Sequence, residues 1–271
     1  MPIVREPLDP KSSQWHFLAF YLRFLREKAG LSLTQCGRIL NVARSTVSNM
    51  EAGRLRPHEG HLVKLDEKYG TGNLLQVMLW YARMAHDPDW FGQFSTYEQE
   101  AKSIRIYHGQ TVPHPLQTEK YTRSLLSAGS PKGLEDELRE RAERKAAIHE
   151  RDDPPDLWVL LSEGVLAQEV GGIKVMAGQV RHLLEMVDER SVILRIVPFS
   201  AGGTLGVDGS FQIIRLETRD VAYVGAQCGG RLIESPREVR EVGDIFERIG
   251  AKALPESDSR EMIAQYLERY T

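Results

Sequence analysis

The feature that most constrains the fold of this chain is a pair of short helical patterns joined by a tight turn near the N-terminus. Ser32, followed three residues later by Gln35, is a capping-box pattern that opens a helix expected over Thr34–Leu40. A turn at Asn41–Ala43 leads into a second expected helix, about Arg44–Glu51. Helices this short are stable only when they pack on their neighbours. The segment therefore predicts a helix-turn-helix within a small helical bundle.

The second helix of this pair has an apolar inner side and a polar outer side. The apolar residues suited to packing the two helices together are Ile39, Leu40, Val42, Val47 and Met50. Among the residues left outside, Arg44 can bond guanine twice and Asn49 can bond adenine twice, while a hydroxyl such as that of Ser45 can bond a base or a phosphate. This outer side is typical of a helix that reads the major groove of DNA.

Three further helical patterns surround the pair. They are Gln14–Ala29, His61–Tyr69 and Asn73–Met84. The first two are followed directly by glycine, a common C-terminal cap. We expect an all-α domain of five helices over residues 14–90, after an extended arm over residues 1–13 that contains three prolines.

The charge of the chain is unevenly distributed. Residues 1–86 contain 12 Lys and Arg against 7 Asp and Glu, whereas the remaining residues contain 23 against 31. A basic first domain suits a polyanionic partner such as double-stranded DNA, and an acidic second domain would be repelled by the same partner. A chance difference between two domains explains the asymmetry equally well.

The sequence has no apolar run long enough to span a membrane and no signal-peptide pattern. Its two cysteines, Cys36 and Cys228, lie far apart in sequence and cannot make a disulfide framework. We therefore expect a cytoplasmic protein without a membrane partner.

The stretch Leu25–Pro57 resembles the XRE family of lambda-repressor/Cro-like helix-turn-helix regulators. Its sequence is LREKAGLSLTQCGRILNVARSTVSNMEAGRLRP, with an LRE-x-x-GLS start, an R-S-T-V-S recognition helix and an E-x-G-x-x-x-P exit. The resemblance implies that Arg44, Ser45 and Asn49 contact bases. It implies phosphate contact or positioning for Thr46, Ser48, Gln35, Arg38, Arg54 and Arg56. The alternatives are a bundle that has lost DNA binding and, for the last two arginines, solvated loop charges.

The first helical pattern carries a second apolar stripe in addition to the one that such domains bury. The stripe consists of Phe17, Phe20, Tyr21 and Phe24, at helical spacing. A helix that is apolar over so much of its circumference must bury both sides. We expect this stripe to contact the second domain or a second protomer, and a larger internal core is the equally weighted alternative.

Residues 91–271 are expected to form an α+β domain with a small, mainly antiparallel sheet. The helical patterns are Thr118–Ala128, Leu134–Glu150, Lys174–Asp188, Pro236–Ala253 and Asp258–Tyr270. The strand patterns are Leu157–Leu161, Ser191–Val197, Ser210–Leu216, Val221–Gln227 and Arg231–Ile233. Their short, turn-rich connections favour antiparallel pairing over βαβ units. The polar run Gln93–Glu100, which follows Pro88 and Gly92, is interpreted as a break between the domains.

The second domain also resembles the C-terminal domain of a group of actinomycete regulators that are described as antitoxin-like. The matching pieces include VPHPLQTEKYTRSLL at Val112–Leu126, LLSEGVLAQEVGG at Leu160–Gly172, VMAGQVRHLLEM at Val175–Met186, ILRIVPFSAGG at Ile193–Gly203 and GSFQIIRLE at Gly209–Glu217. The resemblance implies a domain that senses a signal or binds a partner, commonly a small protein encoded nearby. It implies no particular ligand.

Candidate catalytic and metal-binding residues are few. Ser162, Glu163, His149 and His182 do not form a recognisable catalytic pattern. The histidines have no metal-ligand spacing with a cysteine or a pair of carboxylates. We therefore expect no enzyme activity, no cofactor and no metal. The glycine-rich stretch Ser200–Ser210 can cradle an anion, but a mobile hairpin connection is the favoured interpretation.

Together these patterns predict a transcriptional regulator, acting as a homodimer, that binds a two-fold DNA site through residues near Arg44–Asn49. Its second domain is expected to receive a protein or ligand signal. One alternative is an antitoxin-like module that neutralises a small partner protein and regulates its own gene. Another is a regulator gated by a small molecule.

Overall fold

The computed structural model describes residues 8–84, 90–129, 133–189, 191–225 and 230–271. The chain divides into two compact units, residues 1–90 and residues 91–271. Each unit is described by itself below, as unit 1 and unit 2.

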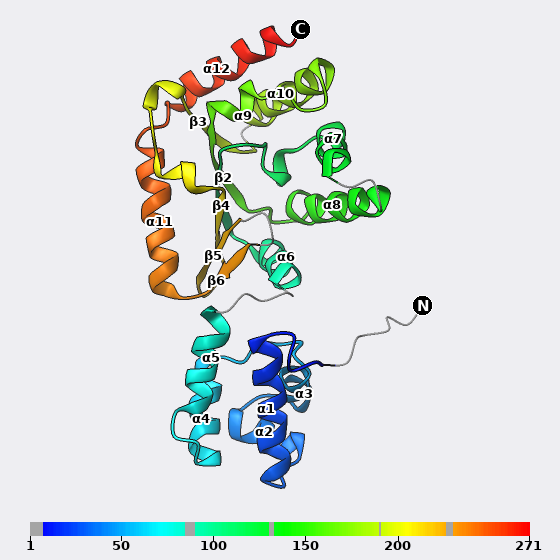
Figure 1. Cartoon of the computed structure of the whole chain (residues 1–271), viewed down its shortest axis with the longest axis vertical. Helices are drawn as coiled ribbons and strands as arrows, with labels where there is room; N and C mark the ends of the chain where they lie inside the picture. The colour runs from blue at the N-terminus through cyan, green and yellow to red at the C-terminus, as the bar shows by residue number, and fades with distance from the viewer. Residues whose placement is uncertain (1–7, 85–89, 130–132, 190, 226–229) are drawn as a thin grey trace. The chain divides into compact units, whose positions relative to one another are not determined.

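Unit 1 consists of helices. They are α1 (Gln14–Lys28), α2 (Leu33–Leu40), α3 (Arg44–Glu51), α4 (Glu59–Tyr69) and α5 (Leu74–Met84) (Figure 1). The predicted helical N-terminal region is confirmed. Of the arm expected over residues 1–13, residues 1–7 lie outside the described part of the chain. Residues 10–12 form a turn, in which the Ser12 N–H donates to the carbonyl oxygen of Asp9 at 3.1 Å.

All five helices of unit 1 contribute to one apolar core. Its buried members are Leu18, Leu22, Leu25, Cys36, Leu40, Val47, Met50, Leu62, Leu65, Leu75 and Leu79. The ends of the helices follow local signals in the sequence. Ser13 accepts a hydrogen bond from His16 N at the start of α1, and Gly70 ends α4 in the left-handed conformation. The spacing of leucines and the caps together account for this bundle.

Unit 2 is built on a six-stranded mixed sheet. Its strands are β1 (Ser103–His108), β2 (Asp156–Ser162), β3 (Ile193–Val197), β4 (Phe211–Arg215), β5 (Asp220–Val224) and β6 (Arg231–Ile233). The strand order is β3-β2-β1-β4-β5-β6. Strands β1, β2 and β3 are parallel, and β4 pairs antiparallel with β1 and with β5. The expected combination of helices and a sheet is confirmed, but the sheet is larger than expected and two of its five strand pairs are parallel, so the expectation of a small, mainly antiparallel sheet is met only in part.

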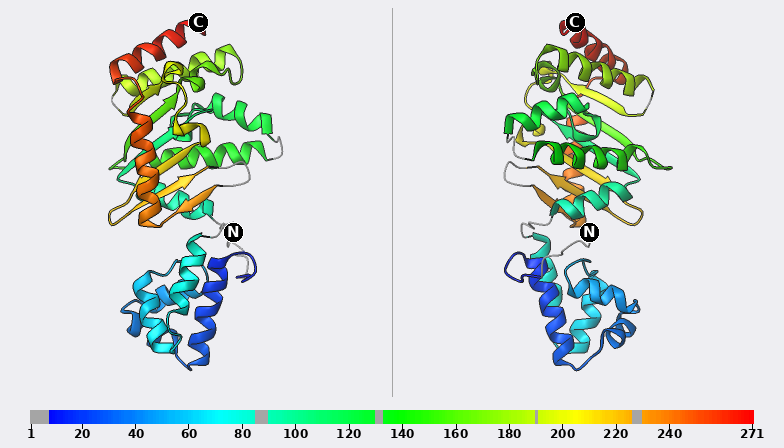
Figure 2. Two further views of the ribbon diagram at one scale, coloured as in Figure 1. Left: turned by 60° about the vertical axis from the view of Figure 1, so that its left-hand side comes forward. Right: turned by 90° about the vertical axis from the view of Figure 1, so that its right-hand side faces the viewer.

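Helices cover both faces of this sheet (Figures 1 and 2). Those of unit 2 are α6 (Trp90–Glu100), α7 (Glu119–Gly129), α8 (Leu134–His149), α9 (Glu163–Ala167), α10 (Ile173–Asp188), α11 (Pro236–Gly250) and α12 (Glu256–Arg269). Helix α11 lies on one face, where Phe246 and Ile249 pack with Tyr107 and Phe211 of the sheet. Helices α6, α7 and α8 lie on the other face, and the last two belong to the crossover between β1 and β2.

Two details of unit 2 also differ from expectation. The polar run Gln93–Glu100 lies within helix α6, because Phe94 and Tyr97 are buried and Glu98 accepts a hydrogen bond from Arg144 of α8 at 2.8 Å. The stretch Ser200–Ser210 joins β3 to β4, which are not neighbours in the sheet, so it is not a hairpin connection. Both errors arise from partners that lie far away in the sequence.

Candidate nucleic-acid interface

Helices α2 and α3 are held in a tight helix-turn-helix by the backbone of the turn. Asn41 ends α2 in the left-handed conformation, with φ 60° and ψ 45°, which asparagine tolerates better than most residues. A methyl group on Gly37 would come within 2.7 Å of the carbonyl oxygen of Val42. Glycine is therefore required at this position for α2 to approach the turn so closely.

The predicted capping box at the start of α2 is present. The Ser32 hydroxyl accepts from Gln35 N at 3.2 Å, and the Gln35 side-chain oxygen accepts from Ser32 N at 2.8 Å. Gln35, a predicted positioning residue, thus uses its amide oxygen to begin the helix. The amide NH₂ group of Gln35 carries donors only, so it takes no part in the capping box. Arg38, in the last turn of the same helix, is exposed.

The inner side of α3 is fixed by apolar packing and by one buried ion pair. Val47 and Met50 lie in the core of unit 1. Glu51 receives hydrogen bonds from two nitrogens of Arg26, Nε at 2.6 Å and Nη2 at 2.8 Å. The side chains of Arg26 and Glu51 are only 11% and 8% exposed. The bond to Glu51 raises the pKa of Arg26, so the guanidinium stays charged, and the bond connects α3 to α1.

The outer side of α3 carries the predicted DNA contacts. Arg44 and Ser45 are exposed, and Thr46, Ser48 and Asn49 are half-buried. Ala43, the residue before the helix, makes no side-chain capping bond. The amides of Arg44 and Ser45 therefore remain able to donate to a phosphate oxygen, whereas Thr46 N already donates to the Ala43 carbonyl oxygen at 3.0 Å.

The two arginines after α3 lie in different surroundings. Arg54 Nε donates to the side-chain oxygen of Asn49 at 3.0 Å. The Asn49 amide nitrogen is therefore turned away from this bond, and one side chain orients the other. The Arg56 guanidinium lies over the ring of Trp15, 4.3 Å from its centroid. The first contact joins the loop after α3 to α3 itself and the second joins this loop to α1. Trp15 was not among the residues singled out in the sequence.

Each of the two units matches a protein-family model. Residues 18–75 match a family model described as a helix-turn-helix domain. Residues 91–265, more than half of the chain, match the model described as a domain of unknown function (DUF5753). The chain belongs to the DUF5753 family. No curated protein and no solved structure matches it significantly.

The match to the helix-turn-helix model supports a DNA-binding function for unit 1, and the DUF5753 domain supplies unit 2. Within the ranges that the structure describes, no helix is both long enough and apolar enough to cross a membrane. The same ranges hold no cluster of side chains suited to a metal ion.

The aromatic stripe on α1 is divided between the core and the surface of unit 1. Tyr21 packs against the core and stacks with Phe17 and Phe24, at centroid distances of 6.2 Å and 5.8 Å. Phe17, Phe20 and Phe24 are 42%, 44% and 45% exposed. Helix α5, which packs beside α1, adds exposed Trp80. Of the four predicted residues, Tyr21 thus packs against the internal core of unit 1 and the three phenylalanines are exposed.

Proposed function

We propose that this DUF5753 protein is a cytoplasmic, sequence-specific transcriptional regulator of the XRE type. In this proposal α3 enters the major groove, Arg44, Ser45 and Asn49 contact bases, and the neighbouring polar side chains hold the phosphates. The latter are Thr46, Ser48, Gln35, Arg38, Arg54 and Arg56. Its main support is the outer side of α3, where an exposed guanidinium and an arginine-oriented carboxamide lie on a helix whose inner side is fixed in the core.

Selection from a random pool of double-stranded DNA tests this function. We expect the full-length protein to enrich one motif with two-fold symmetry, whose half-sites lie about one helical turn, roughly 34 Å, apart. Enrichment of a single asymmetric site would contradict the homodimer. Binding that depends on salt but not on sequence would contradict the regulator itself.

We further propose that the exposed aromatic residues of α1 form the contact between two protomers. Phe17 and Phe24 both stack on Tyr21, and contiguous exposed apolar side chains commonly mark an interaction surface. The variant with both Phe17→Ser and Phe24→Ser is expected to shift the protein from dimer to monomer in sedimentation equilibrium. Val63→Ser removes an apolar residue of α4 that is 46% exposed and should leave the dimer intact. A dimer of unchanged affinity in the double variant would remove these residues from the interface.

The DUF5753 domain is proposed to receive the signal that changes DNA affinity. Capture of a small partner protein, encoded nearby, is a second candidate function because the stretch after β3 exposes apolar side chains. Phe199, Leu205 and Val207 are 61%, 44% and 75% exposed. A complex of fixed stoichiometry with that protein, measured by mass in solution, would support an antitoxin-like role. Regulation by a small molecule predicts instead a ligand pocket in the same domain.

A further inference from the structure

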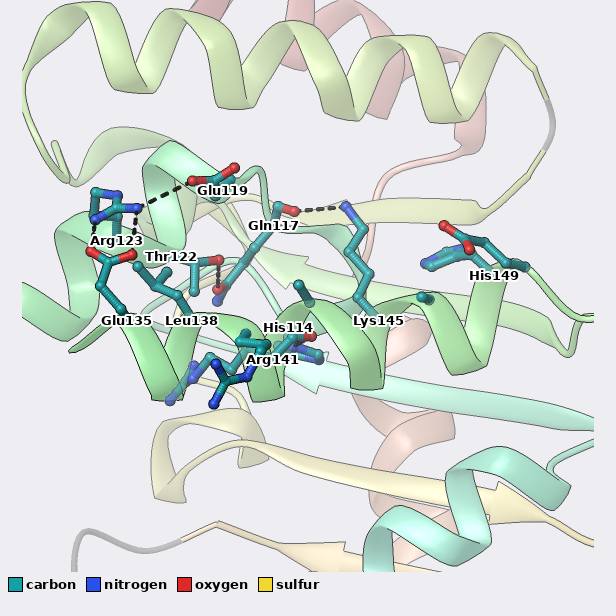
Figure 3. Close-up of a pocket in the computed structure, with 14 residues that line it drawn as sticks. His114, Gln117, Glu119, Thr122, Arg123, Glu135, Leu138, Arg141, Lys145 and His149 are labelled. Atoms are coloured by element: carbon teal, nitrogen blue, oxygen red, sulfur yellow. Dashed lines mark hydrogen bonds and ion pairs between the residues drawn. The ribbon is translucent and has the colours of Figure 1, made fainter. Parts of the chain in front are cut away.

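A pocket of about 470 Å³ lies between α7 and α8 in the DUF5753 domain (Figure 3). Its size is in the range of sites that hold small molecules. Leu138, Ala142 and Ala146 of α8 give it an apolar wall. Lys145 rises from the same helix toward Gln117, and His149 lies one turn further along (Figure 3). The pocket thus combines small apolar side chains with basic ones.

Lys145 is a half-buried cation without a carboxylate. Its Nζ donates to the carbonyl oxygen of Gln117 at 2.7 Å and lies 3.5 Å from His182 Nε2. Within the described ranges it forms no ion pair, and burial lowers its pKa. Transfer of an ammonium group from water without an opposite charge is unfavourable, so the fold retains this lysine at a cost.

Arg141 adds a second cation. It forms no side-chain hydrogen bond or ion pair with any described residue; burial and the nearby Arg144 lower its pKa, and the charge of Glu137 acts in the opposite sense. His114 also lines the pocket, and its Nε2 donates to the Arg141 carbonyl oxygen at 3.0 Å. Its buried Nδ1, which has no hydrogen-bond partner in the described part of the chain, is therefore an acceptor that requires a donor group from a ligand or a water, not an oxyanion. Unsatisfied groups of this kind are uncommon in folded proteins and often indicate a missing ligand or water.

The carboxylates of the pocket do not neutralise these cations. Arg123 bonds Glu135 at 2.6 Å and Glu119 at 3.4 Å, so both acids already share one arginine. Glu150, the remaining acidic residue that lines the pocket, is exposed. The half-buried part of the pocket therefore keeps a positive potential.

A groove on the opposite face of the sheet shows the contrast. It is also rich in arginine, but Arg105 lies within 3.7 Å of Asp220 and 3.6 Å of Glu247. Arg195 donates to three backbone carbonyl oxygens, including that of Leu254 at 2.8 Å. Arg105 therefore has two carboxylates nearby and Arg195 has three carbonyl partners, whereas Lys145 donates to one carbonyl oxygen and pairs with no carboxylate among the described residues.

We propose that the α7–α8 pocket binds a small molecule that carries an oxyanion, a phosphate or a carboxylate, next to an apolar portion. Lys145 supplies the central charge, Arg141 adds to the potential, and the alanines of α8 accommodate the apolar portion. As an effector site the pocket rests on the proposed regulator function. As an anion site it can be tested without DNA.

Titration of inorganic pyrophosphate and of acetate into the full-length protein, by calorimetry at constant ionic strength, tests the site. We expect saturable binding of at least one of these anions. Lys145→Gln keeps a donor for the Gln117 carbonyl oxygen but removes the charge, and should weaken binding about tenfold. Lys120→Gln makes the same substitution at an exposed position on α7 and should leave binding unchanged.

The stability of the same variants separates a ligand site from a structural role. In the absence of added anion, Lys145→Gln is expected to keep or raise the melting temperature, because it removes an uncompensated charge. A melting temperature that falls while anion affinity is unchanged would make Lys145 a structural residue. Failure of both anions to bind, or equal weakening by Lys145→Gln and Lys120→Gln, would also overturn the proposal. Loss of DNA binding alone would not affect it.

The pH dependence gives a further readout. Burial lowers the pKa of His149 and the pKa of His182, and the charge of Lys145 lowers both further. Glu150 raises the pKa of His149, and Glu185 raises that of His182. His182 is also lowered by His149. A bound anion favours the charged imidazoles, so binding takes up protons, and because both pKa values are lowered it should strengthen as the pH falls below the ordinary value of histidine, about 6.5. Affinity that is independent of pH would place the anion away from these histidines.

Discussion

Replacement of Glu51 by glutamine is expected to destabilise the helix-turn-helix unit by about 3–5 kcal/mol. The substitution leaves Arg26 charged and buried, replaces the carboxylate with a neutral amide that offers one acceptor oxygen instead of two, and leaves Glu27, which is more exposed, as its remaining carboxylate. An uncompensated buried guanidinium is unfavourable because it has lost its hydration. Hydrogen exchange of the amides in residues 14–84, measured in the full-length protein, reports the opening of this unit separately from that of the DUF5753 domain.

Glu27→Gln is the matched control for this prediction. It removes one charge from a carboxylate that pairs with Arg23 and lies 3.5 Å from Arg26, and the side chains of Arg23 and Glu27 are 62% and 53% exposed. Water screens such a pair, so protection of the amides should hardly change. If Glu51→Gln and Glu27→Gln had equal effects on exchange, the buried pair would not hold α3 against α1.

Arg44→Ala is expected to cost about 1–3 kcal/mol of binding free energy on the selected DNA site and to relax preference at one base pair. A guanidinium that bonds two atoms of guanine loses both bonds together, while binding to unrelated DNA suffers only the loss of one charge. Binding titrations on the selected site and on its single-base variants measure both quantities. Equal losses on all sequences would remove Arg44 from base recognition.

Arg54→Ala should act on sequence preference as well as on overall affinity. Because Arg54 bonds the side chain of Asn49, the alanine variant frees the Asn49 carboxamide, which is proposed to contact adenine. The salt dependence should flatten by about one unit if Arg54 also neutralises a phosphate. Arg54→Lys restores the charge without the planar fork and should recover the salt dependence but not the base preference.

The helices of unit 1 could be predicted from the sequence because their signals are local. Ser32 and Gln35 make the expected capping box, and Gly70 ends α4 by adopting the left-handed conformation that was expected of it. The sheet of unit 2 was misjudged because strand β1, Ser103–His108, was not recognised. This strand pairs with residues more than forty positions away, in parallel on one side and antiparallel on the other. No local pattern specifies such pairing.

The contact of the candidate residues with DNA stays a prediction, and the connections between their side chains were not predicted from the sequence. The polar outer side of α3 follows directly from the spacing of Val47 and Met50. The bond from Arg54 to Asn49 depends on the shape of a loop, and the pair of Arg26 and Glu51 joins residues far apart in sequence. The pocket in the DUF5753 domain depends on which carboxylates already have partners. Only the three-dimensional structure shows which carboxylates have partners.

The position of β1 in the middle of the sheet has a consequence for synthesis on the ribosome. Both of its neighbours come later in the chain, β2 at Asp156–Ser162 and β4 at Phe211–Arg215. The helices of unit 1 make contacts at short separations and can assemble while translation continues. The centre of the sheet must wait until most of the polypeptide has left the exit tunnel. A nascent molecule would therefore hold a formed helix-turn-helix before the domain proposed to control it exists.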